Sequence, residues 1–137
     1  MKDISVHDNI LLSYDVLCEK QEIHLHTAFL DAEPHEYTDV IFSGVVGYHF
    51  LHDNLHTIIF DVEEVELEEI YAANEELFIR GKNHGWPMSY ESKEELVLKM
   101  RGENVKAFII SSSYGLDGWV WARDLTKTLK PAPGSEI

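Results

Sequence analysis

The segment TIIFDV (residues 57–62) is followed after three residues by ELEEIYAANEELFIRGKN (residues 66–83), and the change of pattern between them decides the fold class. The first segment is a run of β-branched and aromatic residues, which is typical of a strand. In the second, apolar residues recur every three or four positions with glutamates between them, which predicts an amphipathic helix over residues 66–83. Acids lie toward its start and bases near its end, in agreement with the helix dipole. Strands and helices therefore occur together in one chain.

The residues before this segment predict three more strands. Residues 10–17 and 23–29 alternate between two faces and are joined by a short polar link, so we expect an antiparallel hairpin. In its second strand, His24 and His26 face away from the core. Residues 40–51 form a long third strand, in which Gly44 and Gly47 indicate a bulge or bend.

The residues after the helix predict a second helix and a returning hairpin. Ser92 and Glu95 have the spacing of a capping box that opens a helix through about residue 101. Strands are expected at residues 105–113 and 119–122, with a turn at Asp117-Gly118. We therefore predict an α+β domain over residues 1–126, of β4-α2-β2 order. It has about six strands in a predominantly antiparallel sheet and two helices packed on one face. Residues 127–137 are predicted to be a flexible tail.

The net charge of −14 is concentrated in one part of the chain. Residues 21–79 contain fourteen Asp and Glu and neither Lys nor Arg. Such a field repels nucleic acid and anionic membranes, and it favours a basic protein partner or metal ions. Solubility alone is the alternative explanation of the charge.

The single cysteine and the N-terminal residues indicate the cellular compartment in which the protein is expected. Cys18 cannot form an intramolecular disulfide, so a reducing compartment is expected. The first residues carry acids where a signal peptide needs a basic head, and no apolar run approaches about 18 residues. These features predict a cytoplasmic protein without a membrane span.

Six of the eight histidines lie within residues 21–79, among carboxylates. Imidazole and carboxylate together suit zinc or nickel, although no metal-binding motif of recognisable spacing is present. No metal site or cofactor is assigned from sequence. The candidate metal ligands that this argument leaves open are His24, His26, His49, His52 and His56.

Catalytic residues are not predicted. SSSYG (residues 111–115) lacks the glycine two positions before the serine that a nucleophile elbow requires. Paired carboxylates are expected by chance where acids are so dense, so they indicate no acid–base role.

Contact surfaces are predicted instead from acids and aromatic residues. Seven acids occur within residues 63–76 with no base among them, and the segments NHGWPMSY (83–90) and YGLDGWVW (114–121) are rich in residues that anchor interfaces. The predicted partner-binding residues are Glu63, Glu64, Glu66, Glu68, Glu69, Glu75, Glu76, Trp86, Tyr114 and Trp119.

The layout of the chain also resembles a known class of proteins. VIFSGVVGYHF (residues 40–50), the acidic strand-to-helix passage, SSYG (112–115) and GW (118–119) are similar in arrangement to small acidic α+β domains of uncharacterised bacterial proteins. These include immunity proteins of polymorphic toxin systems. The resemblance implies a non-enzymatic protein that neutralises a cationic toxin, with fast association driven by charge. A small-molecule or divalent-metal-binding protein, using the histidines or the Trp86 loop, is the alternative, and a homo-oligomer is a third.

Overall fold

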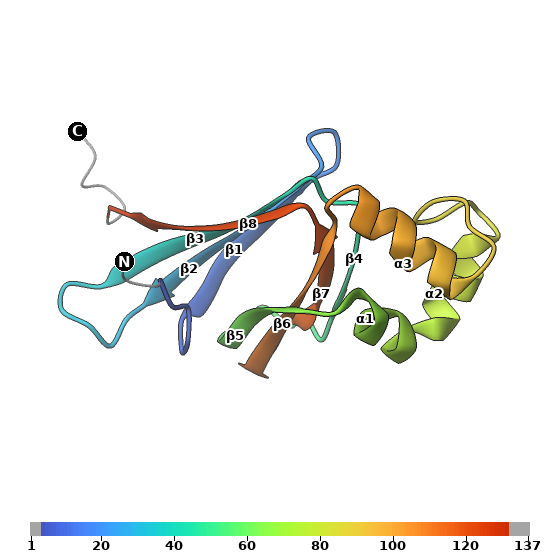
Figure 1. Ribbon diagram of the computed structural model, residues 1–137. Helices are drawn as coiled ribbons and strands as arrows, with labels where there is room; N and C mark the ends of the chain where they lie inside the picture. Colours follow the sequence, from blue (N-terminus) through green and yellow to red (C-terminus); the bar gives the residue numbers. More distant parts are fainter. Residues whose placement is uncertain (1–3, 132–137) are drawn as a thin grey trace.

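The computed structural model describes residues 4–131, which form an antiparallel sheet with three helices at one side (Figure 1). Over these residues the chain forms five strands, three helices and three further strands. The first strands are β1 (Ile10–Leu17), β2 (Glu22–Phe29), β3 (Glu36–Ser43), β4 (Gly47–Leu51) and β5 (Ile58–Val65). The helices are α1 (Leu67–Ala73), α2 (Glu75–Lys82) and α3 (Lys93–Gly102). The last strands are β6 (Lys106–Tyr114), β7 (Asp117–Ala122) and β8 (Asp124–Lys130).

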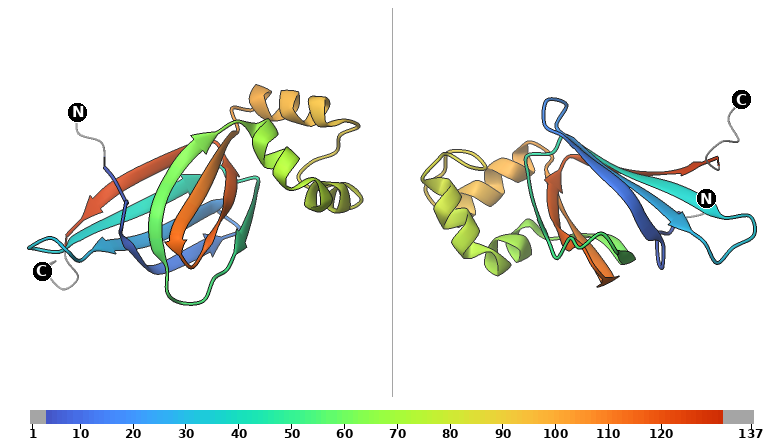
Figure 2. Two further views of the ribbon diagram at one scale, coloured as in Figure 1. Left: turned by 90° about the horizontal axis from the view of Figure 1, so that it is seen from below. Right: turned by 180° about the vertical axis from the view of Figure 1, so that it is seen from behind.

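The sheet is strongly bent, and its two halves face each other (Figures 1 and 2). Its strand order is β4-β7-β6-β5-β1-β2-β3-β8. One half is β1-β2-β3-β8 and the other is β4-β7-β6-β5. At one place β1 and β5 join them, where Ile10 pairs with Ile58. On the opposite side the chain itself joins the halves, where it passes from β3 to β4 and from β7 to β8. The Val46 N–H donates to the Trp121 carbonyl oxygen (2.9 Å), and the Arg123 N–H donates to the Ser43 carbonyl oxygen (3.0 Å). These two hydrogen bonds connect the two passages.

The α+β class and the antiparallel sheet are as predicted, but the described sheet has eight strands where about six were expected. The segment expected as one strand over residues 40–51 is divided into β3 and β4. Gly44 adopts φ +62° there, and a Cβ on it would lie 2.9 Å from the Cβ of Arg123. The expected bend at this glycine therefore separates two strands instead of bulging one.

The predicted flexible tail is also corrected in part. Residues 127–130 belong to β8, which pairs with β3 along its whole length, from Ser43↔Asp124 to Tyr37↔Lys130. The alternation of threonine with leucine and lysine over residues 125–129 is a period-two pattern that indicates this strand. The rest of the predicted tail, residues 132–137, lies outside the described residues.

One hydrophobic core fills the space between the two halves of the sheet. Each strand contributes alternate side chains, because side chains of a strand point to opposite faces. The largest fully buried members are Phe42, Ile23, Leu25, Ile59, Ile110, Leu116, Val6, Val40 and Val120. His24 and His26 of β2 and Asp39 of β3 alternate with these core residues and consequently lie on the outer surface of this half.

A second core lies between the helices and the outer face of β6 and β7. Phe78 of α2 stacks on Trp119 at a centroid distance of 5.5 Å and on Tyr71 at 4.9 Å. The predicted single helix over residues 66–83 is two helices, since Asn74 leaves helical geometry at φ −133° and its side-chain amide donates to the Ile70 carbonyl oxygen (2.8 Å). The predicted cap of α3 is confirmed: the Ser92 hydroxyl accepts from the Glu95 N–H (3.2 Å).

Candidate functional site

The outer surface of β1, β2 and β3 carries a cluster of histidines and carboxylates. Ile23 and Leu25 point into the core, so the alternation of β2 places His24 and His26 on the opposite, outer face, as the sequence predicts. Their ring centroids are 6.2 Å apart. Two imidazoles two residues apart on one strand are thus held side by side.

Strand register brings a carboxylate opposite each of these histidines. Asp15 of β1 pairs with His24, and Asp39 of β3 pairs with His26. Directly opposed side chains in antiparallel strands are close enough to interact. A cluster of four side chains from three strands therefore follows from the register alone.

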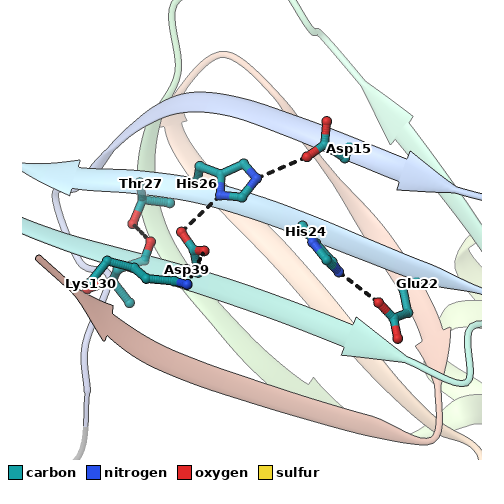
Figure 3. Close-up of polar contacts among 8 residues, drawn as sticks. Asp15, Glu22, His24, His26, Thr27, Asp39 and Lys130 are labelled. Carbon is teal, nitrogen blue, oxygen red and sulfur yellow. Dashed lines mark hydrogen bonds and ion pairs between the residues drawn. The ribbon is translucent and has the colours of Figure 1, made fainter. Parts of the chain in front are cut away.

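Carboxylates hold both imidazoles in place (Figure 3). For His26, Nδ1 lies 2.9 Å from Asp39 Oδ1 and Nε2 lies 3.0 Å from Asp15 Oδ2. For His24, Nε2 lies 2.9 Å from Glu22 Oε1. Lys130 Nζ of β8 lies 3.7 Å from Asp39 Oδ2, which extends the polar chain across four strands. The orientation of both rings is therefore fixed before any ligand arrives.

The protonation of His26 reflects opposing influences. Burial by itself lowers the pKa of His26, whereas its hydrogen bonds to Asp39 and Asp15 raise it, and the result is a pKa above the ordinary 6.5. Protons therefore compete with a bound cation more strongly at this imidazole than at one with the ordinary pKa. Any cation that binds here binds less tightly as the pH falls.

This cluster has the composition and spacing of a metal site. One ligand atom from each of Asp15, His24 and His26 lies within 4.8 Å of the other two. Metal-binding histidines commonly have their second ring nitrogen held by a carboxylate. Asp39 holds Nδ1 of His26 and Glu22 holds Nε2 of His24 in this way. Nδ1 of His24 stays available for a metal, whereas Nε2 of His26 contacts Asp15 Oδ2, so a metal would replace that contact and bind both atoms.

The other candidate histidines do not join this cluster. Among residues 4–131, Asp15, His24 and His26 form the single group of three potential ligands within this spacing. His49 lies on β4 opposite Trp119, and His52 contacts Asp117 at 3.3 Å. His56 lies exposed in the loop before β5.

The predicted acidic contact residues lie in different environments. Glu66 and Glu68 both contact the Arg101 guanidinium, at 3.1 Å and 2.6 Å, and Glu76 contacts Arg80 at 3.4 Å. The contact with Arg101 holds the pKa of Glu68 below its usual value. Glu63 and Glu64 are adjacent residues of β5 and point to opposite faces. The remaining members, Glu69 and Glu75, are exposed.

The predicted aromatic contact residues also separate. Trp119 is only 4% exposed and belongs to the core beneath the helices, so it cannot contact a partner directly. Tyr114 is 58% exposed at the end of β6, and Trp86 is partly exposed beside α2. Of the three predicted aromatic residues, only Tyr114 and Trp86 are therefore accessible to a partner.

Sequence reasoning found the two histidines of the cluster but missed Asp15 and Asp39. Asp15 could have been found, because the predicted hairpin of residues 10–17 and 23–29 places it on the same face as the histidines. Asp39 lies just before the strand predicted from residue 40, whereas β3 begins at Glu36. Its position opposite His26 follows only from the observed register.

Comparisons with protein-family models, curated proteins and solved structures found no match for this chain. Within residues 4–131, no helix is long and apolar enough to cross a membrane.

Proposed function

We propose that this protein binds one divalent transition-metal ion through Asp15, His24 and His26. The observation that carries the proposal is the convergence of their ligand atoms within 4.8 Å, on imidazoles already oriented by carboxylates. Two imidazole nitrogens and one carboxylate oxygen suit zinc, nickel and cobalt. Water molecules complete the coordination, because Asp15 is exposed and the two histidines are partly exposed.

Charge favours a cation at this place. Asp15, Glu22 and Asp39 surround the two imidazoles, and within the cluster only Lys130 offsets them, through Asp39. The whole chain carries −14. A divalent ion relieves the repulsion among these carboxylates while it takes ligands that are already in place.

Thermal unfolding of tag-free protein tests the proposal. The protein is first treated with chelator and then unfolded with and without zinc or nickel in excess. An ion present at 100 times its dissociation constant stabilises the folded state by about 2.7 kcal/mol. We therefore expect the unfolding temperature to rise with each metal in the wild type, and not in the variants His24→Gln and His26→Gln.

His35→Gln is the matched control, because it removes an exposed imidazole outside the cluster. It should keep the full metal response. An equal response in His26→Gln and His35→Gln, or no response in the wild type, would show that Asp15, His26 and Asp39 only connect the strands.

The leading sequence-based hypothesis, a basic protein partner bound by the acids of residues 63–76, stays a prediction. Three of its seven acids are in ion pairs, and adjacent members face opposite ways. The geometry therefore favours the metal site over a single acidic docking surface.

A further inference from the structure

A hollow of about 570 Å³ lies where the β1–β2 turn, the β3–β4 link and α2 meet. Its volume falls within the usual range of small-molecule sites. Most of its wall is apolar, with a few polar side chains at intervals. The apolar wall includes Val16, Ile23, Val45, Val46, Leu77 and Trp86.

The indole of Trp86 is a fixed, flat part of this wall. A Cβ on Gly81 would lie 2.3 Å from Trp86 Cε3, and a Cβ on Gly47 would lie 3.0 Å from Trp86 Cζ2. Only glycine at residue 81 lets the ring sit against α2. On its inner side the ring stacks on Phe78, with centroids 5.2 Å apart. Trp86 is therefore held rigidly and can stack a planar group without losing side-chain freedom.

The polar groups of the hollow include a cation available to a ligand. Arg80 is 72% exposed, and its ion pair with Glu76 is long, at 3.4 Å, and lies at the surface. Such surface pairs contribute little, so the guanidinium can turn to another acceptor. His84 lies nearby in the lining. The one carboxylate of the lining, Glu22, is already hydrogen-bonded to His24.

We infer that this hollow binds a small molecule with a planar apolar body and one acidic group. The body lies against Trp86 and the aliphatic wall, and the acidic group pairs with Arg80, whose planar fork matches an anionic oxygen pair. This site adjoins the proposed metal site through Glu22, which lines the hollow and contacts His24, but it includes none of the three proposed metal ligands.

Two fluorescent probes that differ in one group test the inference in the presence of chelator. The first is 1-anilinonaphthalene-8-sulfonate, and the second is N-phenyl-1-naphthylamine, which has the same rings without the sulfonate. We expect Arg80→Gln to weaken binding of the sulfonate about tenfold, as for loss of one charge-assisted hydrogen bond, and to leave the neutral probe unchanged. Lys106→Gln, an equal change of charge at an exposed residue outside the lining, should alter neither.

Cys18 reports whether the probe occupies this hollow. It is exposed, it lines the hollow and it is the sole cysteine of the chain. Alkylation with a bulky maleimide should reduce binding of both probes, and Cys18→Ala treated in the same way should bind both normally. Unchanged probe binding after alkylation, or equal effects of Arg80→Gln and Lys106→Gln, would overturn the inference.

Discussion

His26 is the side chain that connects the polar residues of the outer strands. One ring nitrogen meets Asp39 of β3 and the other meets Asp15 of β1, and Asp39 in turn meets Lys130 of β8. An imidazole is suited to this place because it offers two nitrogens on opposite sides of one ring. In the proposed metal site, the contact with Asp39 would orient the ring, and a metal would replace the contact between Nε2 and Asp15.

Asp39 should act as a positioning residue for the metal site. Asp39→Asn keeps a similar shape but removes the charge that holds Nδ1 of His26, so we expect zinc affinity to fall about 10- to 100-fold. Competition with a chromogenic chelator measures it. Asp124→Asn makes the same change of charge at an exposed β8 residue and should change affinity little. Equal losses in both variants would mean that only net charge matters.

Tyr14, which precedes Asp15 in β1 and packs against the core, provides a pH-dependent contact. Its hydroxyl donates to the Asp53 carboxylate, and this hydrogen bond, with burial, raises the pKa of Tyr14 to about 12. A raised pKa stabilises the folded state fully below pH 10, the value in the unfolded chain, and this contribution is lost as the pH rises through 12.

Asp53→Asn should therefore lower the pKa of Tyr14, so that its hydroxyl ionises at a lower pH. Phenolate absorbance in an alkaline titration should show one tyrosine fewer ionising near pH 12 than in the wild type. Tyr90, whose pKa burial also raises to about 12, serves as the internal control and should ionise late in both proteins. Identical titration curves would mean that the Asp53 contact does not govern Tyr14.

Among the elements, the passage from β3 to β4 decides how the sheet bends. Gly44 has φ +62°, and the adjacent Val46 N–H donates to Trp121. Arg123, between β7 and β8, donates from its backbone to Ser43 and from its side chain to the Gly44 carbonyl oxygen (3.2 Å). The β3–β4 link and the β7–β8 link therefore stabilise each other through these hydrogen bonds.

Gly44→Ala should destabilise the protein by about 1–3 kcal/mol, because a side chain there is strained at positive φ and meets Arg123. Urea unfolding measures the loss. Gly102→Ala, where an added Cβ meets nothing within 4 Å, should be neutral or stabilising by up to about 1 kcal/mol. If the two substitutions change the free energy of unfolding equally, a side chain at residue 44 is not strained.

At the scale of the whole molecule, local patterns predicted the hairpin of β1 and β2, the cap at Ser92 and the outward-facing histidines. Strand pairing between distant residues was not predictable from these patterns. Asp39 meets His26 because β3 starts before the run of apolar residues, and β8 is held at the edge of the sheet by its pairing with β3, far away in the sequence. The histidines were visible in the sequence, whereas their carboxylate partners depended on register.

The acidic residues of the molecule differ in what surrounds their charges. Several acids of residues 63–76 are in ion pairs, whereas Asp15, Glu22 and Asp39 gather around two imidazoles on a single face. This is the face where we propose that a divalent cation binds.

Metal stoichiometry in tag-free protein tests this claim most directly. Protein is equilibrated with zinc, freed of excess metal by gel filtration, and analysed for bound zinc and for protein concentration. We predict close to one zinc ion per wild-type chain, and none in the double variant His24→Gln/His26→Gln, with both proteins folded by circular dichroism. No bound zinc in the wild type, or the same amount in the double variant, would contradict the assignment of this face as a metal site.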